Sequence, residues 1–180
     1  MEIKETVSQA LTDSIKECFM GVLSLTLEEF DKADLNNEDH QVVASIGFAG
    51  QLEGNLSIIF SDQSACHVVG KMLYSEFSEV SPDVLDGVGE VVNMTIGGVK
   101  TRLISQFPIE ISIPTTIKGK QIDVFSKKGL TRVYKCYRCA EFELDVVLYF
   151  KLQSEIPEVH AAKTGLSAAE KLAAFVDKNK

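Results

Sequence analysis

Asp86, Glu90 and Asn93 combine two carboxylates and a carboxamide at helical intervals, a set that could take part in a reaction. An α-helix turns by about 100° per residue, so the three side chains would fall within about 60° of one another on one helix face. The Asn carboxamide offers one acceptor and two donors without titrating, and the carboxylates can engage a cation. The set can therefore orient a water molecule beside a positive charge. It contains no nucleophile and no metal framework, so a reaction partner has to supply both.

A helix over residues 81–104 is predicted to position these side chains. Ser81 can cap this helix, Pro82 suits its first turn, and Asp83 complements the helix dipole. Gly97 continues the line of the polar residues. The opposite helix face is apolar and wide enough to pack on a core. Its members are Val84, Val88, Val91, Val92, Ile96, Val99 and Leu103.

Glycines at positions 87, 89, 97 and 98 flank the polar pair Glu90 and Asn93. Each glycine costs a helix up to about 1 kcal/mol relative to alanine, and Asn is also a poor helix former. Small residues around a polar pair leave room for the surface of another protein. Close packing within this chain is the alternative explanation for Gly89 and Gly98.

The composition is that of a soluble globular protein, with 45% hydrophobic and 24% charged residues in a chain of 180. This length fits one domain with a sizeable core. The formal net charge of -8 leaves no basic surface for phosphates, so neither nucleic acid nor an anionic membrane is expected as a partner. No apolar run approaches the roughly 20 residues of a membrane span. The N-terminus lacks the basic start of a signal peptide, which makes the cytoplasm the expected location.

The cysteines and histidines of the sequence form no recognisable catalytic or metal-binding set. Cys136 and Cys139 offer two soft ligands where a structural zinc site needs four, so free thiols are expected. His40, His67 and His160 show no metal-ligand spacing, and His67 is expected to be structural or solvated. The sequence also has no phosphate-binding glycine loop and no supported Ser/His/Asp arrangement.

Helical and alternating patterns predict the order helix, strands, helix, and then the same order again. The predicted elements are a helix at 6–23, an exposed acidic loop at 28–41, a hairpin across 42–60, a helix at 62–74, the helix from 81, strands at 109–113 and 122–124, a turn at 127–129, a strand at 142–150, and a capped helix after Ser167. Glu143 and Asp145 are expected to point outward from the last strand.

The order of elements indicates a duplicated unit, and the first helix supports it. Asp13, Glu17 and Met20 have the same spacing as the three polar residues of the central helix. If the two halves are copies, the first carries an apolar Met in place of the amide. One functional copy remains.

The polar set of the central helix resembles the signature of the CheC/CheX/FliY phosphatases of bacterial chemotaxis. That signature is an Asp or Ser, a Glu further inside the same helix, an Asn three residues after the Glu, and a Pro well beyond the helix. Asp86, Glu90, Asn93 and Pro114 match it. The surrounding sequence, GEVVNMTIGGVKTRL followed by IEISIPTTIKG, looks most like CheX. The single intact motif also resembles CheX. The resemblance covers roughly residues 5–150.

The resemblance implies an α/β (α+β) fold with a pseudo-twofold repeat of helix, strands and helix. The motif helices would pack on one side of a largely antiparallel β-sheet. The expected division is a CheX-like phosphatase domain at 1–152 and a C-terminal extension with a short helix at 153–180. A homodimer is implied as well.

The resemblance also implies an enzyme that hydrolyses the aspartyl phosphate of a CheY-like response regulator. The receiver would supply Mg²⁺, so this chain is expected to carry no cofactor of its own. Asn93 would position the attacking water, and Glu90 would dock on the receiver lysine because two anions repel. Asp86, Gly97 and Pro114 would take part in binding. The alternative is a non-catalytic binding module on the same fold, in a chemotaxis or flagellar-switch assembly.

Overall fold

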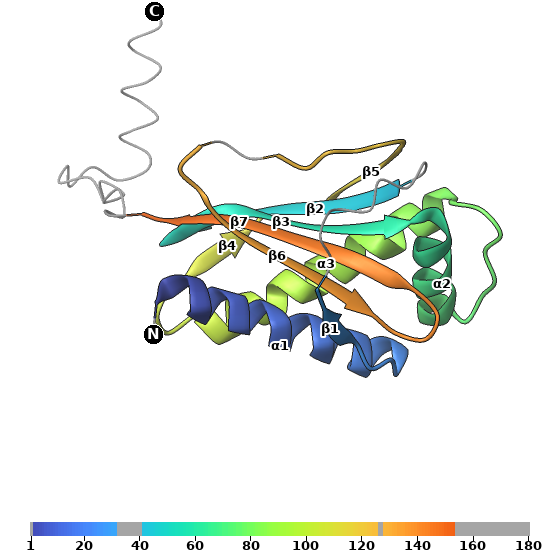
Figure 1. Cartoon of the computed structure of the whole chain (residues 1–180), viewed down its shortest axis with the longest axis horizontal. Helices are drawn as coiled ribbons and strands as arrows, with labels where there is room; N and C mark the ends of the chain where they lie inside the picture. Colours follow the sequence, from blue (N-terminus) through green and yellow to red (C-terminus); the bar gives the residue numbers. More distant parts are fainter. Residues whose placement is uncertain (1, 32–40, 126–127, 154–180) are drawn as a thin grey trace, which may run out of the picture.

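A computed structural model describes residues 2–31, 41–125 and 128–153. Three helices and a seven-stranded sheet make up this described part (Figure 1). The helices are α1 (Ile3–Leu23), α2 (Asp62–Leu73) and α3 (Pro82–Leu103). The strands are β1 (Glu28–Phe30), β2 (Gln41–Gly50), β3 (Leu52–Ser61), β4 (Ile109–Ile111), β5 (Thr115–Gly119), β6 (Thr131–Arg138) and β7 (Glu143–Leu152).

The two halves of the chain exchange their edge strands. The sheet order is β1-β6-β7-β3-β2-β4, and β5 also pairs with β2. The strand that follows α1 therefore pairs with the hairpin of the second half, and the strands that follow α3 pair with the hairpin of the first. Strands β3 and β7 join the hairpins at the centre, and every pairing is antiparallel. The predicted pseudo-twofold fold on a largely antiparallel sheet is confirmed.

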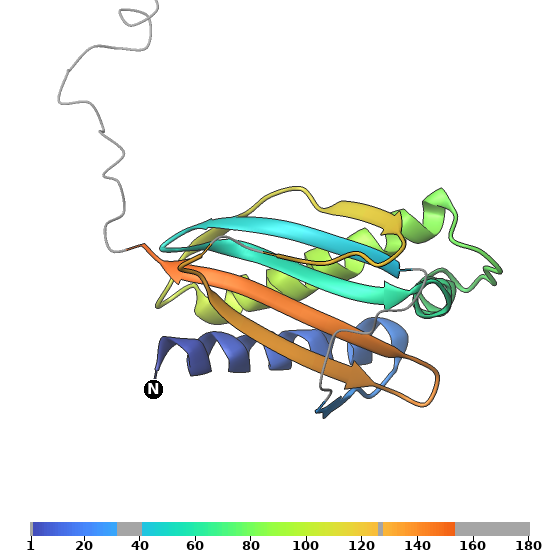
Figure 2. The ribbon, with the colours of Figure 1, turned by 45° about the horizontal axis from the view of Figure 1, so that its top comes forward.

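Helices α1 and α3 lie side by side on one face of the sheet, and α2 lies at one end (Figures 1 and 2). The main core fills the space between these helices and the sheet. All seven apolar residues predicted for the inner face of α3 belong to this core and are at most 2% exposed. The opposite face of α3 is therefore left for solvent.

Small and polar side chains let α1 and α3 approach each other closely. A Cβ atom on Gly98 would lie 2.9 Å from the Cβ of Ser14. The Arg102 guanidinium donates to the Ser14 hydroxyl over 3.2 Å and also to the Glu17 carboxylate. Since Thr95 meets Cys18 and Gly98 meets Ser14, the two helices run antiparallel.

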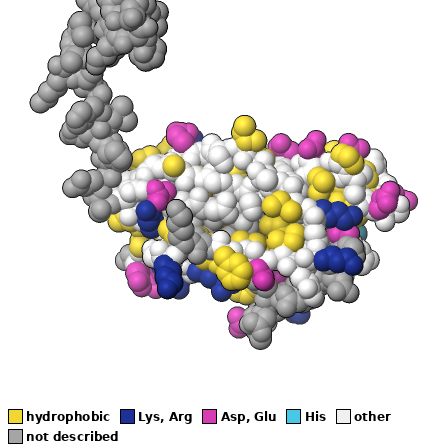
Figure 3. Space-filling model, turned by 90° about the horizontal axis from the view of Figure 1, so that it is seen from above, with side chains coloured by type: hydrophobic (Ala, Val, Ile, Leu, Met, Phe, Trp, Pro, Cys, Tyr) yellow, Lys and Arg dark blue, Asp and Glu magenta, His cyan; other side chains and the backbone are white. Residues whose placement is uncertain are grey.

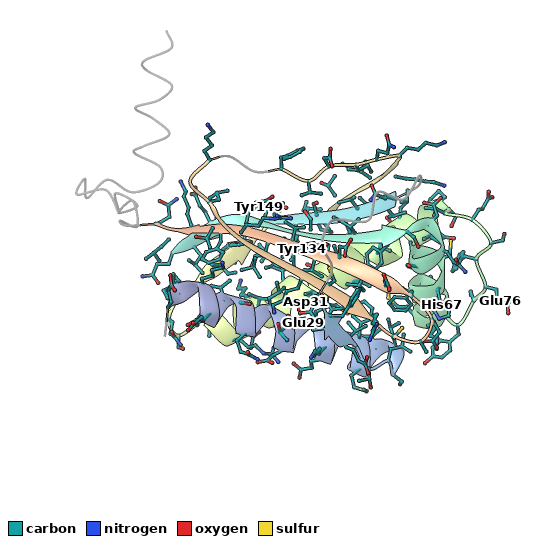
Figure 4. All side chains as sticks on the ribbon, viewed as in Figure 1. Glu29, Asp31, His67, Glu76, Tyr134 and Tyr149 are labelled. Atoms are coloured by element: carbon teal, nitrogen blue, oxygen red, sulfur yellow. The ribbon has the colours of Figure 1, made fainter. Side chains whose placement is uncertain are left out.

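The sheet face away from the helices carries a second, smaller cluster of Val43, Ile59 and Val147. Ile122 and Val124 pack on it, and Tyr149, labelled in Figure 4, donates its hydroxyl to the Val124 carbonyl over 3.2 Å. The predicted strand at 122–124 is wrong, because this segment covers the sheet without pairing in it. Figure 3 looks onto this face, where hydrophobic side chains lie between separate charged groups.

Other local predictions are confirmed or corrected. The hairpin of β2 and β3 and the helix after it are present, and α1 begins earlier, at Ile3. Residues 28–30, expected in a loop, form β1, whose Phe30 lies under the Arg138 guanidinium. Asp145, expected to point outward, lies on the face away from the helices but is only 4% exposed.

The predicted C-terminal helix and the predicted end of the domain at 152 fall at or beyond the limit of the described residues. Within the described ranges, no helix combines the length and apolar character that crossing a membrane requires.

Candidate functional site

The first turn of α3 forms as its sequence predicts and fixes where the helix begins. The Ser81 hydroxyl accepts the backbone N–H of Val84 over 3.4 Å, and Pro82 occupies the first turn with Asp83. With the apolar face buried, Asp86 and Glu90 are exposed and Asn93 is half-buried. We call the face formed by Asp86, Glu90, Asn93 and Gly97 the polar stripe of α3. All four of its members reach the solvated side.

The side chains of Asp86, Glu90 and Asn93 have no partner among the residues that the structure describes. Within the described part of the chain, none of the three makes a hydrogen bond or an ion pair. The cations near the end of α3 are bound: Lys100 pairs with Glu110 at 2.6 Å, and Arg102 pairs with Glu17. The amide and the two carboxylates therefore keep their full hydrogen-bonding capacity for an external group.

The four glycines of α3 serve two different purposes. A Cβ on Gly87 would lie 2.6 Å from both methyl carbons of Val69, so this glycine permits α2 to pack on α3. Gly89 and Gly98 also face neighbours within the chain, as the packing alternative predicted. A Cβ on Gly97 would meet nothing within 4 Å. The interpretation that glycine leaves an open surface therefore applies to Gly97 and is wrong for Gly87.

Pro114 lies beside the polar stripe, although it comes from the sheet. A Cβ on Gly89 would be 3.8 Å from the Pro114 Cγ and 3.4 Å from the Thr116 hydroxyl. Around the helix axis Gly89 is about 40° from Asn93 and about 100° from Glu90. Pro114 thus borders the stripe on the side of Asn93. The structure brings together all five residues that the sequence singled out, four on α3 and one from the adjoining strand segment.

A β-bulge directs Pro114 toward α3. Phe48 pairs with Ile111 and Ser45 pairs with Thr115, so two residues, 113 and 114, stand opposite the single Ile46. A bulge changes which face the following side chains occupy. The alternation over residues 109–113 predicted a regular strand, so the bulge was not expected. A proline within an alternating pattern was the available signal, because proline is confined to edges and bulges.

The corresponding stripe on α1 is arranged differently. Asp13 and Glu17 are exposed and Met20 is 48% exposed, so the three residues do share the outer face. Glu17, however, is bound by Arg102. The first copy therefore lacks the amide and also has its central carboxylate occupied.

The cysteines provide no activated nucleophile. Burial raises the pKa of the Cys18, Cys66 and Cys139 thiols above the ordinary value, which keeps them protonated and weakly nucleophilic. The thiol of Cys139 donates to Glu141 over 3.3 Å, and that of Cys136 donates to the Tyr134 hydroxyl over 3.1 Å. Both lie apart from α3.

An open groove of about 1040 Å³ lies between α2 and the loop that follows it, and no residue of the polar stripe lines it. His67 and Glu76, labelled in Figure 4, both line it. The His67 ring lies 5.7 Å from that of Phe142, which is a packing contact. Among the described residues, no three His, Cys, Asp or Glu side chains are grouped to hold a metal ion.

Comparisons with known proteins agree on one family. A family model described as chemotaxis phosphatase CheX matches residues 42–135. The protein named CheY-P phosphatase CheX from Thermotoga maritima is 27% identical over 124 residues, which are 67% of this chain and 80% of that protein.

Several solved structures share the fold, two of which illustrate the likeness. The chemotaxis protein CheX from Vibrio vulnificus matches with a TM-score of 0.72 and 24% identity, covering 79% of this chain and 95% of that one. A CheX–CheY–BeF3–Mg²⁺ complex from Borrelia burgdorferi matches with a TM-score of 0.67 and 19% identity, covering 79% of this chain and 96% of that one. At these identities the likeness is one of fold.

Proposed function

The chain belongs to the chemotaxis phosphatase CheX family, and we propose that it hydrolyses the aspartyl phosphate of a CheY-like response regulator. One observation carries the proposal. Glu90 and Asn93 stand one helix turn apart on a solvated face, without partners among the described residues. Side chains held rigidly on a helix and left unpaired are suited to entering another protein's active site.

Asn93 acts on the water molecule that attacks phosphorus. Its carboxamide can accept one hydrogen bond from this water and donate two others, to the water or to the phosphoryl oxygens. It remains neutral at every pH of interest, so it adds no repulsion beside the phosphoryl group. Holding a water in line is the role that an amide side chain plays in GTP hydrolysis.

Glu90 acts in binding and alignment. A carboxylate placed directly against a phosphoryl group would be strongly repelled in a desolvated site. A lysine of the receiver domain is the suitable partner, because a charge-assisted hydrogen bond fixes both distance and direction. With Glu90 on that lysine, Asn93 lies one turn further along α3, at the phosphoryl group.

Asp86, Gly97 and Pro114 complete the docking surface in this proposal. Asp86 extends the polar stripe by one turn toward the helix N-terminus, and Gly97 leaves the opposite end open for close approach. Pro114 borders the stripe at Gly89. The Mg²⁺ ion that neutralises phosphoryl charge belongs to the receiver in this proposal. The Borrelia burgdorferi complex, which contains CheY, BeF3 and Mg²⁺ together with CheX, supports this assignment. We also propose that the protein is a cytoplasmic homodimer.

The test uses the full chain with every CheY-type receiver encoded in the same genome. Each receiver is phosphorylated with a small-molecule phosphodonor in the presence of Mg²⁺, and the loss of the acyl phosphate is followed with and without this protein. Faster loss for at least one receiver is the expected result. If a receiver binds without faster loss, the protein is instead a non-catalytic binding module.

A further inference from the structure

The bulge opposite Ile46 also places an isoleucine at the edge of the polar stripe. Strand β4 ends at Ile111, but Ser112 still bonds to Gly47. Alternation continued through Ser112 puts Ile113 on the side of Ile111, which is partly buried and packs on the main core. Ile113 itself is 87% exposed. Its neighbour Pro114 lies against α3 at Gly89. An exposed aliphatic side chain therefore directly precedes Pro114, the residue that borders the polar stripe.

Ile113 is exposed but its backbone is firmly held. The Ser112 N–H donates to the Gly47 carbonyl over 2.9 Å, and the Gly47 N–H donates to the Ser112 hydroxyl over 3.0 Å. On the other side, Thr115 resumes the pairing with Ser45. The isoleucine is thus displayed from a fixed point, which lowers the entropy lost when a partner covers it.

The charges near the polar stripe do not by themselves account for affinity, because apart from the contact proposed for Glu90 they repel an anionic partner. Asp83, Asp86 and Glu90 are all exposed acids on the same half of α3, and a phosphorylated aspartate site is itself anionic. Like charges slow the encounter and weaken the complex. Apolar contact has no such cost, and interface affinity is usually concentrated in a few buried side chains.

We propose that Ile113 is a specificity-determining residue, an apolar anchor that inserts between hydrophobic side chains of the receiver beside its phosphorylated aspartate. This inference rests on the proposed function and adds to it the origin of partner selection. Glu90 and Asn93 would engage groups that all receivers share, whereas Ile113 would contact a surface that differs between receivers. Receivers with a polar residue at the contact would be rejected.

The experiment compares Ile113→Asp, Ile113→Leu and the control Phe125→Asp. Phe125 is similarly exposed, at 83%, but follows Val124, which packs on the sheet face away from the helices. Binding is titrated against the receiver activated with beryllofluoride and Mg²⁺, and KM and kcat are measured with the phosphorylated receiver. Thermal unfolding is recorded for each variant to separate binding from stability.

Ile113→Asp should weaken binding and raise KM by about tenfold or more while leaving kcat and the unfolding temperature unchanged. Ile113→Leu and Phe125→Asp should behave like the wild type. Unchanged affinity in Ile113→Asp overturns the anchor even if the phosphatase is active. If wild type binds without catalysis and Ile113→Asp loses binding, the anchor stands and the proposed hydrolysis fails. If the wild type neither binds nor catalyses, both proposals fail.

Discussion

Arg102 of α3 donates a hydrogen bond to the carboxylate of Glu17 on α1, the residue that corresponds to Glu90 in the other half of the repeat. One of two equivalent carboxylates is therefore bound inside the molecule, and the other, Glu90, makes no ion pair or hydrogen bond with the described residues. Met20, an apolar residue, occupies the position that corresponds to Asn93, which agrees with this division. The α1 copy helps to hold the helices together, and the α3 copy carries the candidate site.

Arg102→Ala is expected to lower the free energy of unfolding only modestly, by about 0.2–1 kcal/mol, because Arg102 and Glu17 are both partly exposed. Urea denaturation at low and high salt would measure this loss, which should shrink as salt screens the ion pair. Arg102→Lys keeps the charge and loses the second donor to Ser14, so its free energy of unfolding should fall between those of the wild type and Arg102→Ala. A loss well above 3 kcal/mol would contradict the view of this pair as a surface contact.

Asn93→Ala is expected to abolish most of the acceleration of acyl-phosphate loss, by about a hundredfold or more in kcat, because a single orienting group is removed from the transition state. Affinity for the activated receiver should be retained. Single-turnover kinetics with excess protein would separate the two effects. Gln9→Ala is a suitable control, since it removes an exposed helical carboxamide whose hydrogen bond within the described part of the chain is to Asp13 at the surface.

Glu90→Gln is expected to act mainly on KM, because it removes the charge that pairs with the receiver lysine and keeps the size of the side chain. Titration of the activated receiver should show weaker binding, with a smaller dependence on salt than in the wild type. Glu76→Gln removes another exposed carboxylate, from the loop after α2, and should change neither the binding affinity nor its salt dependence. Equal losses of kcat in Glu90→Gln and Asn93→Ala would argue against separate roles.

Gly97→Ala is expected to raise the free energy of unfolding by up to about 1 kcal/mol, because alanine is the better helix former and its Cβ would meet nothing. Gly87→Ala should lower it, since its Cβ would collide with Val69. Chemical denaturation of both variants measures the contrast. Gly97→Phe should remain folded and lose receiver binding. Normal binding by that variant would show that the stripe is not approached at Gly97.

The elements closest to the candidate site were the most predictable. The cap at Ser81 and Pro82 and the apolar repeat of α3 are local signals, and together they fix both the start and the rotation of the helix. Exposure of Asp86 and Glu90 follows once the opposite face is buried. The fold class, too, was predicted correctly, because the family resemblance supplied what the local patterns did not.

Features that depend on tertiary contacts were missed or misjudged. Strand β1 is short and acidic, and it exists because β6 offers a neighbour with Lys135 and Arg138 for its glutamates. Gly87 received a surface explanation because Val69 is distant in sequence. The alternation of Ile122 and Val124 arises from packing over a sheet and not from pairing within it. No local pattern distinguishes these cases.

The exchange of edge strands between the halves also bears on how this fold can be taken apart. A fragment ending after α2 would hold β1 without β6, and its hairpin would have neither β7 on one side nor β4 and β5 on the other. Unpaired strand edges are templates for association. This fragment and the complementary one that begins before α3, produced separately and then mixed, should therefore rebuild the sheet by complementation. Either fragment alone should aggregate.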